Sequence, residues 1–306
     1  MDLAYLRAHP DHLPTFLTHQ RIRETPVHGG SIAAASRLTL DDGASVFAKR
    51  WPEPAAGVTP SRPSARPAGF FEAEAAGIQW LRIDGGAPLP QVIAALPDIL
   101  ALEWIDEGAP SAGAARAFGA ALARTHRAGA PAFGTAWPGY IGALPLDNTQ
   151  AAGPWSTWFA VRRLEPYLRL SVDRGALGAA DAAAVQALIT DIAIYAGEAD
   201  AEPPARVHGD LWPGNLLWAA AGPVYLIDPA AHGGHRESDL AQLSLFGGAP
   251  YLADMIAAYQ REWPLSPGWA ARLPLHQLHL LLVHTALFGS GYRDVVMSAV
   301  RATVER

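Results

Sequence analysis

The feature that most constrains this chain is a pair of short apolar runs in its second half, each of which leads into a carboxylate. The first run leads into Asp210 within the segment VHGDLWPGNLLW, residues 207–218. The second run, VYLI, leads into Asp228. Short apolar runs bounded by turn residues are typical of strands. We therefore expect two strands that present aspartates at their edges.

Asn215 follows Asp210 with four residues between them. This spacing matches the catalytic loop of kinases, and Asp228 then stands where a second metal-binding carboxylate belongs. Phosphoryl transfer requires positioning and charge neutralisation more than covalent chemistry. Asp210 can accept the proton of an attacking hydroxyl, and Asn215 and Asp228 offer the hard oxygen ligands that Mg²⁺ prefers. Both aspartates could instead cap turns beside ordinary strands, but the three residues together favour the kinase interpretation.

The N-terminal half predicts a small antiparallel sheet with a glycine-rich first turn. Residues 21–27 indicate a strand, and two alternating runs, SRLTL and SVFAKRW, flank the tetrapeptide DDGA at 41–44. Asp-Gly between such runs is a strong hairpin signal. The segment HGGS at 28–31 falls where a nucleotide-covering loop belongs, although Gly-Gly turns alone are weak evidence. We predict ATP contacts from Gly29, Gly30 and Ser31.

Lys49 is the only lysine of the chain and lies in the third predicted strand. It resembles the kinase lysine that pairs with the α- and β-phosphates of ATP. A strand lysine is more often solvent-exposed, but a sole lysine at this position weakens that alternative. Glu74, on a helix predicted at 70–83, is its expected partner, and Glu72 is the competing choice. Glu74 is preferred because it lies among the core positions of that helix, which are Phe71, Ala75, Ile78 and Leu81.

The small lobe is predicted to end at LALEWI, residues 100–105. Two strand candidates, PQVIAAL and DILALEWI, lead to that point, so five strands and one main helix form the lobe. In a two-lobed kinase this edge becomes the hinge, whose backbone groups hydrogen-bond adenine. We predict that contact for Glu103, Trp104 and Ile105. The fold class is α+β, a bilobal protein-kinase-like fold with an N-terminal ATP-binding lobe (1–105) and a C-terminal catalytic and substrate lobe (106–306).

The remaining segments divide into a predicted loop and a mostly helical second lobe. Residues 52–68 are rich in Pro, Ser and Ala and predict a flexible loop. One helix is predicted at 111–128 and two between 155 and 199. A β-rich island follows at 206–228, and the pattern is helical again from Glu237 to the C-terminus.

The composition excludes several classes of function. The net charge is −6 and the arginines are scattered, which leaves no basic footprint for nucleic acid and no polybasic membrane patch. The chain has no cysteine, so disulfides, thiolate catalysis and cysteine-based metal sites are excluded. No run reaches the ~18 apolar residues of a spanning helix, and the N-terminus lacks an apolar signal core. We expect a monomeric cytoplasmic enzyme with no nucleic-acid or membrane partner.

These segments together resemble the fructosamine (ketosamine) kinases, relatives of the aminoglycoside and choline kinases. The resemblance rests on HGDLWPGN followed by IDPAAHGGHRESDLAQLSLFGGAP, a combination that choline and aminoglycoside kinases usually lack. Further counterparts follow in the same order along nearly the whole chain: FFEAEAAGIQWL, LALEWI, LARTHRAG, YIGALPLDN, WSTWFAVRRL and LHQLHLLLVHTALFGSGY.

The resemblance implies a kinase-like fold that uses ATP and Mg²⁺. It implies phosphorylation of a sugar hydroxyl on a ketosamine, the rearranged adduct of a sugar with an amine, either free or protein-bound, as in deglycation. By the same resemblance Asp210 is the base, and Asn215 and Asp228 hold metal. Lys49, together with Glu74, orients the phosphates.

On the substrate side the resemblance points to a polar run and one later histidine. Residues of the polar run would line or support the acceptor: His235, Arg236, Glu237 and Asp239. Glu237 and Asp239 can equally be acidic residues at a helix start. His284 is a further candidate, with a buried structural role as its alternative. Two departures stand out, because Ser31 replaces a cysteine found in many relatives and Val283 replaces a common asparagine.

Two other functions stay open on the sequence. Fold and phosphate chemistry are shared across the superfamily while the acceptor pocket varies, so an aminoglycoside or amino-sugar phosphotransferase is the first alternative. A catalytically silent nucleotide-binding module is the second, although the chain keeps every residue of the phosphate machinery named above. A protein kinase is disfavoured because only eight residues separate Asp228 from the predicted helix start at Glu237.

Overall fold

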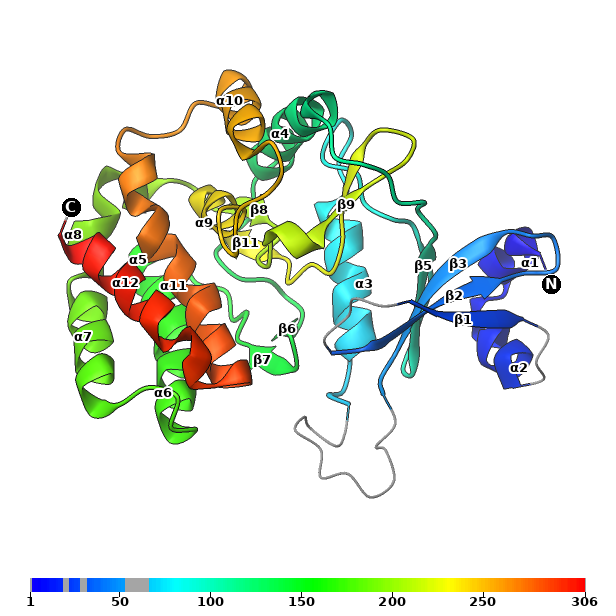
Figure 1. Cartoon of the computed structure of the whole chain (residues 1–306), viewed down its shortest axis with the longest axis horizontal. Helices are drawn as coiled ribbons and strands as arrows, with labels where there is room; N and C mark the ends of the chain where they lie inside the picture. The colour runs from blue at the N-terminus through cyan, green and yellow to red at the C-terminus, as the bar shows by residue number, and fades with distance from the viewer. Residues whose placement is uncertain (1, 19–21, 28–31, 53–65, 306) are drawn as a thin grey trace.

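The computed structural model describes residues 2–18, 22–27, 32–52 and 66–305. Figure 1 shows two lobes of unequal size, with the N-terminus on the small lobe and the C-terminus at the opposite end of the molecule. The small lobe carries the main sheet and the large lobe is mostly helical. The predicted bilobal α+β fold is therefore confirmed.

The small-lobe sheet has five antiparallel strands in the order β1-β2-β3-β5-β4. The predicted hairpin between β2 and β3 is confirmed, because Leu40 N donates a hydrogen bond to Ala44 O at 2.9 Å. Gly43 in this turn has φ 82°, a left-handed conformation that glycine adopts without strain. The strands are β1 (Arg23–Val27), β2 (Ala34–Thr39), β3 (Ser45–Arg50), β4 (Val92–Leu96) and β5 (Ile99–Glu103).

Alternation along the strands sends neighbouring side chains into two different layers. On one face, Ala48 of β3 belongs to a buried cluster with Leu6 from the N-terminal helices. On the other face, Leu100 of β5 packs in a cluster with Phe71. Lys49 follows Ala48 and therefore points to this second face, toward the large lobe. The elements that cover the two faces are α1 (Leu3–Ala8), the 3₁₀ turn η1 (Pro10–His12), α2 (Leu13–Thr18) and α3 (Phe70–Leu81).

Helix α3 confirms the apolar face predicted for it. Phe71, Ala75, Ile78 and Leu81 are all buried. The helix begins after Gly69 and ends two residues earlier than predicted, because Arg82 takes an extended conformation (ψ 116°). This packing fixes the helix against the sheet, with Glu74 beside β3.

The region between residues 155 and 199 differs from its prediction, since four short α-helices replace the expected two. The break between the second and third falls at Gly175, which has φ 69°. A π-helical stretch, η2 (Ala160–Leu164), joins the first two. Within it the buried Arg163 donates to Asp147 O and Asn148 Oδ1, at 2.7 Å each. These long-range hydrogen bonds have no signature in the local pattern.

The large lobe otherwise follows the predicted helical pattern, and helix α4 matches the segment expected at 111–128. Ser111 caps this helix by accepting a hydrogen bond from Ala114 N. The α-helices are α4 (Ala112–Arg127), α5 (Trp155–Phe159), α6 (Glu165–Asp173), α7 (Ala179–Thr190), α8 (Ile192–Ala196), α9 (Arg236–Gln242), α10 (Leu252–Glu262), α11 (Trp269–Phe288) and α12 (Arg293–Val304). Short 3₁₀ turns are η3 (Gly197–Ala201), η4 (Pro213–Asn215) and η5 (Ser290–Tyr292).

The predicted β-rich island contributes to two separate two-stranded sheets and does not form a single sheet. A further two-stranded sheet, β6–β7, lies earlier in the chain and was not predicted from the sequence. Strand β10 pairs with β9, and β11 pairs with β8, both antiparallel. The strands are β6 (Gly139–Ile141), β7 (Leu144–Leu146), β8 (Ala205–Val207), β9 (Leu216–Trp218), β10 (Val224–Leu226) and β11 (His232–Gly234).

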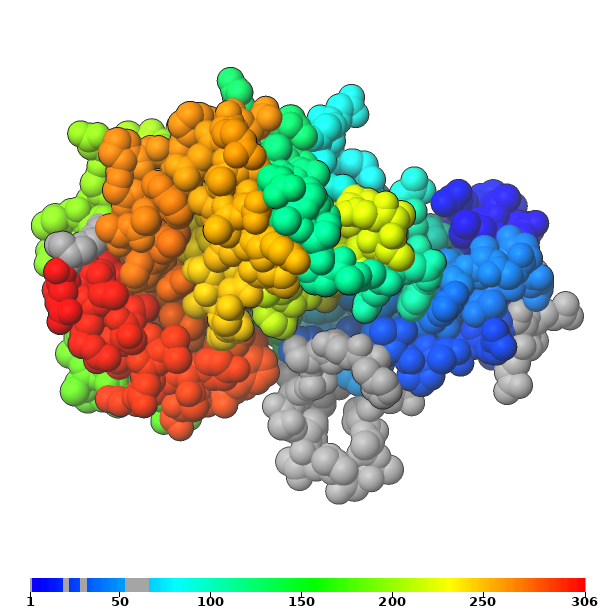
Figure 2. Space-filling view, turned by 45° about the horizontal axis from the view of Figure 1, so that its top comes forward, coloured from blue at the N-terminus to red at the C-terminus, as the bar shows by residue number. Residues whose placement is uncertain are grey.

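The two lobes share one apolar core. A single buried cluster contains Phe71 and Leu100 from the small lobe together with Leu226 and Tyr259 from the large lobe. The turn between β9 and β10 adds a backbone contact, because Ala220 N donates to the carbonyl of the segment after β5 at 2.8 Å. Figure 2 shows this turn, in yellow, against that green segment. The lobe boundary predicted after residue 105 lies in this segment after β5, next to the residue that accepts the hydrogen bond from Ala220.

Among the described residues no single helix has both the length and the apolarity needed to cross a membrane. One pair of helical segments, Ala179–Thr190 and Ile192–Ala201, meets that test only when joined, and the pair is bent by 66°.

Candidate active site

Lys49 joins the two lobes through two carboxylates. Its Nζ donates to Glu74 Oε1 at 2.7 Å and to Asp228 Oδ1 at 2.5 Å. Burial alone would lower the pKa of Lys49, but the charges of Asp228 and Glu74 hold it above its ordinary value. The lysine is therefore a cation fixed between a helix of the small lobe and a loop of the large one. Glu72, the competing partner, is exposed.

Asp210 lies in the loop between β8 and β9, where Asn215 organises its carboxylate. Asn215 Nδ2 donates to Asp210 O at 2.7 Å and to Asp210 Oδ2 at 3.2 Å. The other carboxylate oxygen, Oδ1, is buried and has no hydrogen-bond partner. Burial, reinforced by the negative charge of Asp228, raises the pKa of Asp210 well above its ordinary value. A carboxylate of this kind is a competent proton acceptor near neutral pH.

Side chains of helix α9 accept hydrogen bonds from the backbone of the loop that carries Asp210. Asp239 accepts hydrogen bonds from the backbone N–H groups of His208 (2.7 Å) and Gly209 (2.9 Å), and His126 Nε2 lies 3.0 Å from it. Gln242 Oε1 accepts from Leu211 N at 2.6 Å. Asp239, predicted for the substrate side or a helix start, thus serves as a scaffold. His126 and Gln242 carried no signal in the sequence, because their contacts span 31 to 113 positions.

The two apolar runs are tied to each other by His208. Its Nε2 donates to Ile227 O at 2.8 Å, which leaves Nδ1 as the acceptor for Asp210 N at 3.3 Å. Burial lowers the pKa of His208, which favours this neutral tautomer. Asp228 follows Ile227 with φ 56°, an uncommon conformation for a residue with a side chain. Strain of this kind persists where surrounding contacts enforce it, and it is frequent at functional sites.

A cavity of about 500 Å³ lies between the lobes and is lined by residues of both. The cavity contains every predicted residue of the phosphate machinery that the structure describes: Lys49, Glu74, Asp210, Asn215 and Asp228. Gly29, Gly30 and Ser31, predicted to cover ATP, lie outside the described residues, as does most of the Pro-rich segment. Apolar and aromatic side chains that the sequence did not single out complete the lining, among them Ile32, Phe47, Leu102, Tyr140, Trp212 and Leu216.

The predicted hinge residues Glu103, Trp104 and Ile105 also line the cavity. Glu103 is held in the sheet, because its N–H donates to Gln91 O at 2.9 Å. The side chain of Trp104 is held by a hydrogen bond from its Nε1 to Asp106 Oδ1 at 2.8 Å. Within the described part of the chain, the backbone N–H of Ile105 donates no hydrogen bond. A ligand with an acceptor group can therefore use it.

The oxygen donors beside Asp210 fit a divalent cation. Asn215 uses its amide nitrogen on Asp210, which leaves its amide oxygen for a ligand. The side chain of Asp228 is 41% exposed and gives only one oxygen to Lys49. Amide and carboxylate oxygens are ligands that magnesium and calcium accept. A cation here would also reduce the repulsion between the two aspartates.

Three of the predicted substrate residues lie away from the cavity. The guanidinium of Arg236 donates two hydrogen bonds to the carboxylate of Glu202, at 2.7 and 2.9 Å. Its Cζ lies 3.9 Å from the ring centroid of Trp263. Glu237 is fully buried and accepts two hydrogen bonds from Arg272, at 2.8 and 2.6 Å. His235 is likewise buried. The partners of these three side chains lie within the large lobe, so none of the three lines the cavity.

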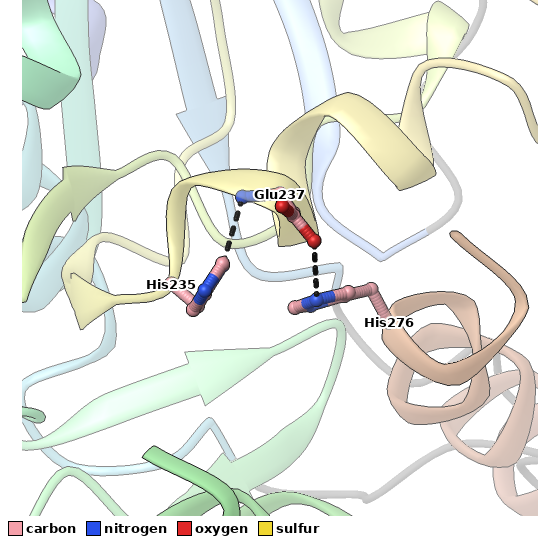
Figure 3. A group of neighbouring side chains, drawn as sticks. All are labelled: His235, Glu237 and His276. Atoms are coloured by element: carbon pink, nitrogen blue, oxygen red, sulfur yellow. Dashed lines mark hydrogen bonds and ion pairs between the residues drawn. The ribbon is translucent and has the colours of Figure 1, made fainter. Parts of the chain in front are cut away.

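Figure 3 shows the buried group formed by His235, Glu237 and His276. His235 accepts from Glu237 N at 3.2 Å through Nδ1 and donates to Ala199 O at 3.0 Å through Nε2. Both ring nitrogens of His235 are thus occupied, and Arg272 already neutralises Glu237. Burial lowers the pKa of His235 to about 4. Burial would raise the pKa of Glu237, but hydrogen bonds from Arg272 and His276 lower it to about 2.

In this group Arg272 pairs with Glu237, and His276 Nδ1 lies 2.9 Å from Ser238 Oγ. His276 Nε2 is 3.3 Å from Glu237 Oε2 and has no other partner among the described residues. The candidate ligand atoms of the three residues lie within 4.8 Å of one another, but His235 and Glu237 are already engaged by other groups. His284, the remaining predicted substrate residue, does not line the cavity described above. Its Nδ1 donates to Leu280 O at 2.8 Å, and its ring packs among aromatic side chains near the cavity.

Comparison with known proteins agrees with this geometry. The sequence model of the fructosamine kinase family matches residues 12–306. A probable ketoamine kinase of Enterococcus faecium is 34% identical over 230 residues, which cover 74% of this chain and 80% of the relative. A Thermobifida fusca structure that carries the name fructosamine-3-kinase is 44% identical, with a TM-score of 0.83 over 93% of this chain and 94% of the other.

A more distant structure shares the fold alone. The aminoglycoside phosphotransferase APH(4)-Ia aligns with a TM-score of 0.58 at 14% identity, over 95% of this chain and 96% of the other. The family match and the close relatives, taken with the interlobe site, make this chain a member of the fructosamine kinase family and an ATP-dependent phosphotransferase that acts on a sugar hydroxyl.

Proposed function

We propose that this protein transfers the γ-phosphate of ATP to a sugar hydroxyl of a ketosamine, with Asp210 as the base. The hydroxyl oxygen forms a bond to the γ-phosphorus while the bond to the bridging oxygen breaks and releases ADP. The hydroxyl proton passes to the Asp210 carboxylate. Catalysis of this reaction depends mainly on positioning and on stabilising charge.

The observation that carries the proposal is the state of the Asp210 carboxylate. Oδ2 is held by Asn215, whereas Oδ1 is buried at the cavity without a partner. A buried acceptor without a donor is costly for a folded protein and is expected to serve a ligand. The raised pKa of Asp210 gives this oxygen the basicity that proton transfer requires.

Lys49 is proposed to bind the α- and β-phosphates. It is a fixed cation in the cavity, and its ammonium donates to both Glu74 and Asp228. Phosphate oxygens can replace the Asp228 contact while the Glu74 contact is kept. Asp228 is then released for the cation that accompanies ATP.

Asn215 and Asp228 are proposed to hold Mg²⁺. When bound, Mg²⁺ would neutralise the charge that develops on the phosphates. The backbone of Glu103, Trp104 and Ile105 is proposed to bind adenine, for which the undonated N–H of Ile105 is the supporting observation. Gly29, Gly30 and Ser31 are proposed to cover the phosphates.

The acceptor is proposed to be a ketosamine, free or attached to a protein, and the enzyme to act as a cytoplasmic monomer. The support is the family membership and the identity with ketoamine kinases over most of the chain. His235, Arg236 and Glu237 would act on the acceptor only indirectly, because each is engaged by a partner within the large lobe. An aminoglycoside or amino-sugar acceptor is the outcome that would replace this assignment.

The test is an acceptor panel measured with purified protein, ATP and Mg²⁺. We expect ADP release with a fructosamine, a ribulosamine or both, and background release with an aminoglycoside. Asp210→Asn should abolish the acceptor-dependent rate. Turnover of the aminoglycoside with neither ketosamine active would overturn the acceptor assignment. ATP binding without turnover of any acceptor would overturn the enzymatic assignment.

A further inference from the structure

A cluster of aromatic side chains lies on the large lobe beside the cavity. The cluster consists of Phe246, His284, Phe288 and Tyr292. The ring of His284 lies 4.8 Å from that of Phe246, 5.4 Å from that of Phe288 and 5.0 Å from that of Tyr292. These residues come from the loop after α9, from α11 and from the turn η5. The phosphate machinery described above uses none of them.

The cluster adjoins the cavity next to the loop that carries Asp210. Trp212 lines the cavity two residues after Asp210, and its ring is 6.0 Å from that of Phe246, edge to face. A second link comes through Leu287, the neighbour of Phe288. A Cβ atom on Gly142 would lie 2.9 Å from Leu287 Cδ1 and 3.7 Å from Ile32 Cδ1. Gly142 and Ile32 both line the cavity, so the end of α11 reaches its edge.

Two of the four rings are exposed to solvent, and His284 and Tyr292 are half-buried. Phe246 is 43% exposed and Phe288 is 50% exposed. Phe246 also has φ 53°, and the two glycines that follow it have φ 98° and 79°. A bulky residue in the left-handed region is a genuine outlier, and such strain gathers at ligand-binding sites. Here the strained backbone holds a large apolar side chain at the surface beside the cavity, where folding alone gains little from it.

The cluster is uncharged near neutral pH. Burial lowers the pKa of His284, and its Nδ1–H is committed to Leu280 O. Arg293, the neighbour of Tyr292, donates two hydrogen bonds to the carboxylate of Asp181, at 2.7 and 2.6 Å, and one to Asp294. Its guanidinium is therefore engaged elsewhere. A ligand of this surface would be recognised through apolar and ring contacts, not through ion pairing.

We propose that this aromatic cluster binds the group carried on the acceptor's nitrogen and selects aromatic or large apolar amines. The inference rests on the proposed function and deepens it. A ketosamine has two parts, a sugar that must bring its hydroxyl to Asp210 and an amine-borne group that must extend away from it. The path from Asp210 past Trp212 leads to Phe246 and the other rings. Adenine would lie at the opposite side of the cavity, against the hinge.

The experiment compares two substrates that differ only in this group, N-benzyl and N-methyl fructosamine. Wild-type protein should show the higher kcat/KM for the benzyl compound. Phe288→Ala should lower kcat/KM for the benzyl compound by about two- to tenfold, the range of one aromatic contact, and leave the methyl compound unchanged. Phe288→Leu should restore part of the loss. Phe246→Ala should act in the same direction.

The matched control is Ile194→Ala, which removes an apolar side chain that is 74% exposed on α8. It should change neither substrate. Equal kcat/KM for the two substrates in wild-type protein, or equal losses for both in the Phe288 variant, would overturn the inference while leaving the proposed function intact. A concentration-dependent dimer that Phe288→Ala dissociates, with substrate preference unchanged, would assign the surface to a second copy of the chain. Turnover of neither fructosamine would remove the proposed function itself.

Discussion

Lys49 Nζ lies 2.5 Å from Asp228 Oδ1, although the two residues are 179 positions apart in the chain. The same nitrogen lies 2.7 Å from Glu74 on α3. One ammonium group thus connects the strand, the helix and the loop on which the phosphate chemistry depends. Of the two contacts only that with Asp228 crosses between the lobes, so a change in the angle between the lobes acts on that contact.

The first prediction concerns the choice between the two glutamates of α3. Glu74→Gln should lower kcat/KM for ATP by about 10- to 100-fold, because Lys49 loses the anion that positions it. Glu72→Gln is the matched control, since Glu72 is exposed on the same helix, and it should leave the constant unchanged. Steady-state kinetics over ATP concentration measures both. Equal effects of the two substitutions would contradict the assigned pairing.

The second prediction concerns the scaffold of the catalytic loop. Asp239→Asn should lower the free energy of unfolding by about 1–3 kcal/mol, because the asparagine turns an NH₂ group toward backbone donors. The value of kcat should fall as well, since the loop that carries Asp210 loses its anchor. Urea unfolding and steady-state kinetics check this. Asp294→Asn, on the exposed start of α12, is the control and should change neither quantity.

The third prediction concerns the buried histidines and acid stability. The pKa of His235 is lowered to about 4 and that of His232 to about 3, both mainly by burial. The unfolded chain therefore takes up protons first, near pH 6.5. The stabilisation is complete above that pH and is lost as the pH falls through about 4 for His235 and about 3 for His232. The contribution to this loss is on the order of 3 kcal/mol for His235 and on the order of 5 kcal/mol for His232.

Urea unfolding at a series of pH values measures the effect. His235→Gln should make the fall in stability between pH 6.5 and 4 shallower than in wild-type protein. His9→Gln, at an exposed position of the N-terminal region, should leave the slope unchanged. An unchanged slope in the His235 variant would contradict the buried neutral imidazole.

The fourth prediction separates the proposed cation site from the buried group in Figure 3. Chelation by EDTA should stop turnover, and added Mg²⁺ should restore it. The melting temperature of the nucleotide-free protein should not change, because Arg272 already neutralises Glu237. Differential scanning fluorimetry measures this. A fall in melting temperature on chelation would show that a resident metal stabilises the fold.

Much of the fold could be predicted from the sequence where local patterns and long-range packing agree. The hairpin at Gly43 and the apolar face of α3 follow from turn chemistry and from helical periodicity. The spacing of Asp210, Asn215 and Asp228 indicated the chemistry because few residue combinations suit it. Asn215 and Asp228 meet because they flank β9 and β10, which pair with each other, and His208 holds the Asp210 loop against Ile227.

The parts that could not be predicted depend on contacts between distant segments. The π-helical stretch contains Arg163, which donates hydrogen bonds to the loop after β7. No local sequence pattern predicts these bonds. His126 on α4 contacts Asp239, which anchors the catalytic loop. Nothing in the sequence around His126 distinguishes it from other histidines in helices. Similarly, His235 and Glu237 are polar in sequence yet turn inward, because Ala199 and Arg272 offer partners inside the lobe.

The most direct test of the central claim is the mass of the acceptor after incubation with ATP and Mg²⁺, compared between wild-type protein and Asp210→Asn. We predict a ketosamine that gains one phosphate with wild-type protein, and a rate lower by about 10²- to 10⁴-fold in the variant, whose ATP affinity is retained. A variant that phosphorylates the ketosamine at nearly the wild-type rate would contradict the role of Asp210 as the base. An unmodified ketosamine with wild-type protein would contradict the account of the substrate.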